Sequence, residues 1–163
     1  MESRKIDRSY IEILIQSLVK KSLVLDKIIE ANAEHASIAA AKDFDPEAFD
    51  VVFDKKDELI KELEQLDKGF NTVYTRVKEE ISINKDSYKE EIAKMQALIK
   101  EITAKSVDIQ AAEKRNKEAL MGRMDMVKRE IYQAKNTRNV AANYYKSMNG
   151  LNYVEPQFMD KKK

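Results

Sequence analysis

The chain has 163 residues, of which 43% are hydrophobic and 36% charged, with a net charge of +1 at pH 7. The absence of cysteine excludes disulfides and thiol catalysis, and the small net charge gives no general attraction to nucleic acid or membranes. Three glycines and two prolines are the few interruptions in long apolar patterns of helical period. This predicts an all-α protein with few loops, which favours an interaction protein over an enzyme.

The first predicted helix covers about residues 6–42. Ser9 and Glu12 form a capping box near its start. Its apolar side chains recur every three or four residues and share one face, at Ile11, Leu14, Leu18, Leu25 and Ile28. The first residues lack the pattern of a signal peptide, and no apolar run is long enough to span a bilayer. We therefore expect a soluble, cytoplasmic protein without membrane insertion.

The second predicted helix covers residues 46–83. Asp45 precedes Pro46, which disfavours a helical backbone at Asp45, and its side chain can cap a helix that begins at the proline. Phe44 and Phe49 stand at the positions of a hydrophobic staple. Gly69 inside this helix indicates close packing or a slight bend. The seam of the helix has coiled-coil spacing, with Lys56 as its polar member: Val52, Lys56, Leu59, Leu63, Leu66, Phe70, Val73 and Val77.

The third predicted helix covers residues 88–148 and is followed by a short irregular tail at 149–163. An unbroken helix of about 60 residues would be roughly 90 Å long. It would outrun its two partners beyond about Asp125 and leave an uncovered apolar stripe, which predicts an external partner. Its seam is polar at Ser106, Glu113 and Asn116, which indicates either a device that sets register or a loosely packed region. The predicted fold is an elongated antiparallel three-helix bundle or coiled coil.

Charge is unevenly distributed along the chain. Residues 43–67 contain ten acidic residues and three lysines, whereas residues 114–146 contain nine basic and three acidic residues. A hairpin of the second and third helices would place these stretches beside each other, which we favour over phosphate contacts with nucleic acid. His35 is the single histidine, and we expect it to be an ordinary, partly exposed side chain. We predict no catalytic, metal-binding or cofactor-binding residue.

Four segments carry a resemblance to a known family. They are the run Lys55–Leu59, the pair Asn116 and Leu120, the segment Ala141–Tyr145 and the ending Gln157–Lys163. With these segments the chain resembles the flagellar export chaperones of the FlgN type. The resemblance implies a small cytoplasmic chaperone that holds the C-terminal helices of hook–filament junction proteins. It also implies that the chaperone delivers them to the flagellar type III export gate.

The uncovered stripe and the resemblance together define a predicted partner-binding set. Its members lie on the late third helix and the tail: Val127, Ile131, Ala134, Val140, Ala141, Tyr144, Tyr145, Met148, Phe158 and Met159. Which of the two tyrosines contacts the client and which the export gate stays open. The alternatives are a self-associating structural coiled coil, for which weak homo-oligomers are expected, and a basic-helix binder of nucleic acid or a regulator.

Overall fold

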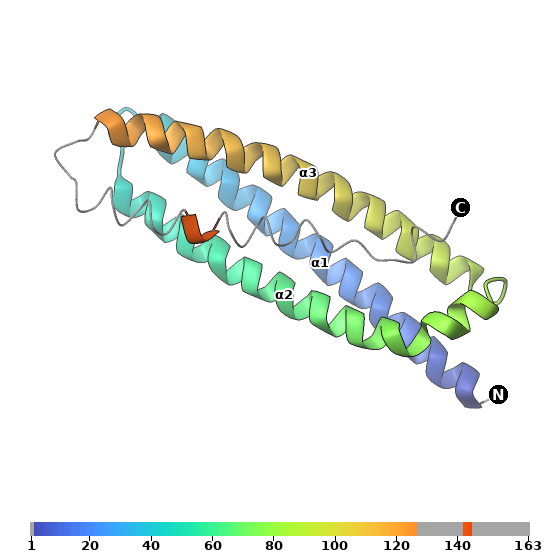
Figure 1. Ribbon diagram of the computed structural model, residues 1–163. Coiled ribbons are helices and arrows are strands. Elements are labelled where there is room, and N and C mark those ends of the chain that lie inside the picture. The colour runs from blue at the N-terminus through green and yellow to red at the C-terminus, as the bar shows by residue number, and fades with distance from the viewer. Residues whose placement is uncertain (1, 127–141, 145–163) are drawn as a thin grey trace.

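The computed structural model describes residues 2–126 and 142–144, with side chains described from Arg8 onward. Three long helices account for nearly all of these residues: α1 at Glu2–Ala40, α2 at Pro46–Ile83 and α3 at Lys89–Met126 (Figure 1). The described part of the chain contains no strand. The prediction of an all-α fold is confirmed.

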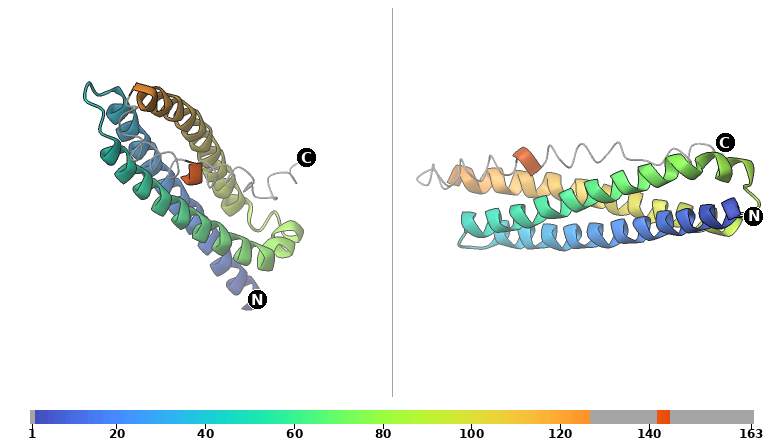
Figure 2. Two further views of the ribbon diagram at one scale, coloured as in Figure 1. Left: turned by 60° about the vertical axis from the view of Figure 1, so that its left-hand side comes forward. Right: turned by 90° about the horizontal axis from the view of Figure 1, so that it is seen from below.

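Helix α1 is the element on which the other two pack. It lies along both α2 and α3, whereas α2 and α3 make few direct contacts with each other (Figures 1 and 2). Ion pairs connect α1 to both neighbours: Lys21–Asp67, Lys55–Glu34, Arg8–Glu91 and Lys105–Asp26. Along these pairs the residue numbers of α2 fall as those of α1 rise, while the numbers of α3 rise with those of α1.

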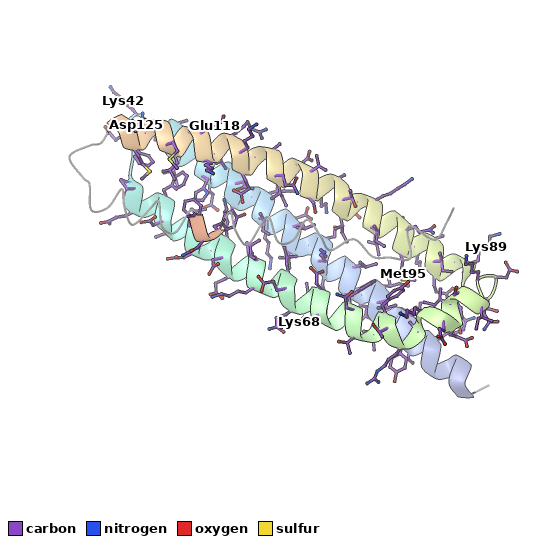
Figure 3. All side chains as sticks on the ribbon, viewed as in Figure 1. Lys42, Lys68, Lys89, Met95, Glu118 and Asp125 are labelled. Atoms are coloured by element: carbon purple, nitrogen blue, oxygen red, sulfur yellow. The ribbon has the colours of Figure 1, made fainter. Side chains whose placement is uncertain are left out.

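The core consists of the apolar faces that the helical period predicts. All five stripe residues named for α1 are buried, from Ile11 through Ile28, and none is more than 4% exposed. From α2, Leu63, Phe70 and Val77 meet them. Burial of a large apolar side chain of this kind stabilises the fold by about 1.5–3 kcal/mol. From α3, Met95 points into the core, whereas Lys68 on α2 points outward (Figure 3).

The junction between α1 and α2 has the predicted structure. The Asp45 side chain accepts hydrogen bonds from the backbone N–H of Glu47 at 3.0 Å and of Ala48 at 3.2 Å. The rings of Phe44 and Phe49 lie 6.0 Å apart, centroid to centroid. The start of α2 at Pro46 is thereby confirmed.

The described residues do not fit the prediction of one straight helix over residues 88–148. The Lys56 Nζ atom lies 2.6 Å from Glu113 Oε1 and 4.1 Å from the centroid of the Tyr144 ring. In a straight helix residues 113 and 144 would be separated by about 46 Å. The side chains of Glu113 and Tyr144 instead meet at one ammonium group, and α3 as described ends at Met126.

Gly69 lies inside α2 without tight surroundings. A Cβ atom placed on it would meet nothing within 4 Å, so the expectation of close packing is wrong.

None of the described helices has the length and apolar character needed to cross a membrane.

Candidate functional site

A buried ammonium group lies where all the described elements meet. Lys56 of α2 is fully buried. Its Nζ donates hydrogen bonds to Asn32 Oδ1 at 2.7 Å, to His35 Nδ1 at 2.9 Å and to Glu113 Oε1 at 2.6 Å. An ammonium group has three donors, and all three are satisfied here by α1 and α3. Lys56 thus holds the three helices in one arrangement.

His35 is fully buried beside Lys56, so the expectation that it is partly exposed is wrong. Its Nε2 lies 3.0 Å from the Phe49 carbonyl oxygen, which can only accept. Nε2 therefore carries the proton and Nδ1 accepts from Lys56. The ring also stacks on Phe49 at 3.9 Å. Burial, followed by the Lys56 charge, lowers the pKa of His35 to about 3, so the imidazole is neutral at physiological pH.

Lys56 and Glu113 form an ion pair that is removed from water. Burial lowers the pKa of Lys56 to about 8, although the Glu113 carboxylate acts in the opposite direction. Burial likewise raises the pKa of Glu113 to about 7, opposed by Lys56. The hydrogen bonds favour the charged lysine at neutral pH, because three acceptors surround Nζ and a neutral amine offers only two protons.

Two of the three polar positions in the α3 seam, Glu113 and Asn116, have specific partners. Asn116 is buried, and its Nδ2 donates to the Asn32 backbone oxygen at 3.0 Å. Glu113 is bound to Lys56. These contacts fix the register of α3 against α1 and α2, so this stretch is not loosely packed. The pair Lys56–Glu113 also has its base on α2 and its acid on α3, which is the reverse of the expected charge pairing between the two helices.

Tyr144 is the member of the predicted partner-binding set that the structure describes, and it is 1% exposed. Its ring covers the Lys56 ammonium at 4.1 Å and lies 5.8 Å from the Phe53 ring. The helical turn at residues 142–144 lies between α2 and α3 (Figures 1 and 2). The expectation that Tyr144 is uncovered is therefore wrong. The other members of the set lie outside the described residues: Val127, Ile131, Ala134, Val140, Ala141, Tyr145, Met148, Phe158 and Met159.

An apolar cleft lies between the same two helices at the end where α2 connects to α3. Its volume is about 350 Å³, which is within the range of ligand-binding pockets. The apolar lining comes from Tyr74 and Ile81 of α2 and from Ile92 and Met95 of α3. The remaining lining includes three exposed lysines and one exposed aspartate: Lys78, Lys85, Lys89 and Asp86.

The described residues contain no group of three or more histidine, cysteine or acidic side chains that could hold a metal ion. No protein-family model, no curated protein and no solved structure matches the chain. The candidate site therefore has two parts: the Lys56 network with Tyr144, and the apolar cleft at the connection between α2 and α3.

Proposed function

We propose that the protein is a cytoplasmic secretion chaperone that binds the C-terminal helices of flagellar hook–filament junction proteins. It would deliver them to the flagellar type III export gate. The observation that supports the proposal is the Tyr144 ring packed on Lys56 and Phe53, with an apolar cleft between α2 and α3 further along. We infer that the two belong to one binding surface between these helices, which we call the α2–α3 groove. Docking of an amphipathic helix into a groove is a common mode of peptide recognition. The resemblance to chaperones of the FlgN type supplies the class of client.

The proposed groove would have a length that suits a helix. Lys56 and Ile81 are 25 positions apart on α2, which corresponds to roughly 37 Å along the helix axis. A client helix of about 25 residues would reach from the Lys56 network to the apolar cleft. At the cleft its apolar side chains would meet Tyr74 and Met95, and acidic side chains would suit the surrounding lysines. We propose an elongated antiparallel three-helix bundle as the body that supports this groove.

The predicted residues beyond α3 remain part of the proposal. Residues from Val127 to Met159 would extend the contact with the client or the export gate. Tyr144 can take part only after its ring has left Lys56, because it is 1% exposed in the structure.

The test is calorimetric titration of the full chain with a peptide of about 25 residues from the C-terminus of a junction protein. The control peptide has the same composition in scrambled order, so that it lacks the apolar stripe. We expect saturable 1:1 binding of the first peptide alone. Absence of binding to every junction-protein C-terminus would refute the proposal. Light scattering over a range of concentrations tests the alternative, since a self-associating coiled coil would gain mass without any client.

A further inference from the structure

The contact between Tyr144 and Lys56 is made through the face of the ring. All three protons of the Lys56 ammonium are donated to Asn32, His35 and Glu113. The ring centroid lies 4.1 Å from Nζ, well within the range of cation–π attraction. The Phe53 ring provides a second aromatic face at 5.1 Å from Nζ. The ammonium therefore contacts Tyr144 through the face of its aromatic ring.

The residues that surround the Tyr144 ring do not depend on the turn that carries it. Lys56 and Phe53 belong to α2, and Asn32 and His35 of α1 accept hydrogen bonds from the ammonium. In the turn that carries Tyr144, by contrast, the two preceding residues 142 and 143 are exposed. Within this described turn, burial is thus concentrated in a single ring. A second ring that approaches along the groove would compete for the same place.

We propose that Lys56 and Phe53 form a preformed binding site for one aromatic side chain. In the free protein Tyr144 fills this site, and in the complex an aromatic residue of the client helix fills it. The second half of this inference rests on the proposed function. It makes occupation by Tyr144 and docking of the client mutually exclusive, so the turn at residues 142–144 sets the threshold for client binding.

The binding site itself can be tested without a client. The Tyr144→Ala variant of the full chain is titrated with p-cresol, which is the tyrosine side chain as a free molecule, and backbone amide shifts are followed by NMR. The control ligand is 4-methylcyclohexanol, which has a similar shape but no aromatic face. We expect saturable shifts at Phe53 and Lys56 in the variant and none in the parent chain. We expect p-cresol to bind about tenfold more tightly than the control, the size of a desolvated cation–π contribution.

Adding Lys56→Met to this variant should remove the preference for p-cresol, because methionine keeps the length of the side chain and loses the charge. Equal affinity for the two ligands in the Tyr144→Ala chain would overturn the aromatic site, as would an absence of binding while circular dichroism shows the helices intact.

Competition with the client is tested with variants whose side chain at position 144 is closer in volume to tyrosine than alanine is. Tyr144→Leu loses the aromatic face, whereas Tyr144→Phe retains it and serves as the matched control. We expect a junction-protein peptide to bind Tyr144→Leu about tenfold more tightly than the parent chain, and Tyr144→Phe within twofold of it. Replacing the aromatic residues of the peptide by leucine should abolish the gain. Equal affinities of the two variants would overturn the competition. Failure of every peptide to bind the parent chain and both variants would refute the proposed function and the client half of the inference, and the p-cresol titration would then decide the aromatic site.

Discussion

In the buried polar network, protonation of His35 and protonation of Glu113 have opposite effects on the free energy of unfolding. Each group therefore hides part of the pH dependence that the other would cause. The pKa of His35 is lowered from 6.5 to about 3 by burial and by Lys56. Between these values the unfolded chain binds one proton more than the folded chain, so acid destabilises the fold through His35. From pH 7 to pH 5 the free energy of unfolding should fall by about 2 kcal/mol. Roughly 1.5 units of this pH interval lie below the unfolded pKa, and each unit contributes about 1.4 kcal/mol.

Glu113 acts in the opposite direction over the same interval. Burial raises its pKa from 4.5 to about 7, so between these values the folded chain binds the additional proton. Acid therefore stabilises the fold through Glu113, again by about 2 kcal/mol from pH 7 to pH 5. The pKa of Lys56 is about 8, above this interval. The contributions of His35 and Glu113 have opposite signs, so the stability of the parent chain should change less between pH 7 and pH 5 than either group alone would change it.

Single substitutions separate the two groups. In Glu113→Gln the His35 contribution is unopposed, so the free energy of unfolding should fall by about 2 kcal/mol from pH 7 to pH 5. In His35→Gln it should rise by a similar amount, because Glu113 is then unopposed. Urea denaturation followed by circular dichroism at several pH values measures both, and differences from the parent chain remove the background of the other carboxylates. Slopes of the same sign in the two variants would refute this account of the network.

Three further substitutions test individual contacts by urea denaturation. Lys56→Met should destabilise the fold by about 3–5 kcal/mol by removing the cation from a buried carboxylate, and adding Glu113→Leu should recover most of this loss; a double variant as unstable as the single one would contradict it. Asp45→Ala should cost about 1 kcal/mol, because the variant loses the cap on two N–H groups of α2, and an unchanged midpoint would argue against it. Gly69→Ala should stabilise α2 by about 1 kcal/mol, because the added methyl meets nothing within 4 Å, and a lower midpoint would show that the glycine has another role.

Local signals in the sequence were sufficient for α2 and for the core faces. The bounds of α2 at Pro46 and Ile83 match the prediction, because Asp45 and Pro46 at one end and the polar run from Asn84 at the other are encoded within a few residues. The apolar stripe of α1 was also readable, since burial follows the helical period.

The arrangement around Tyr144 had no local signal. The apolar pattern continues beyond Met126, and Gly122 has no cap or proline beside it, so the sequence predicted an unbroken helix. In the structure Tyr144 contacts Lys56, which is 88 positions earlier in the chain. Contacts over such separations are set by packing and cannot be inferred from periodicity.

The polar network is indicated in the sequence by polar residues inside apolar seams, but helical periodicity alone does not show that these residues meet. The seam pattern predicts Lys56, Glu113 and Asn116 as polar members of apolar faces, but it does not connect them with one another. It gives no signal for the burial of His35. The observed contacts place residues 32 and 35 of α1 opposite 56 of α2 and 113 of α3. Polar residues at the same level of three packed helices are the pattern that would have predicted the network.

A buried ion pair of this kind is a poor source of stability, since well-packed apolar residues often stabilise a core equally well. The geometry of the ion pair suggests a role other than stabilisation. Lys56 spans the groove to Glu113 at a point where α2 and α3 otherwise make few contacts. Apolar side chains at these two positions would favour direct packing of α2 on α3, because the hydrophobic effect acts without direction. We propose that the ion pair instead keeps α2 and α3 apart at this level, beside the ring of Tyr144 that packs on the same ammonium.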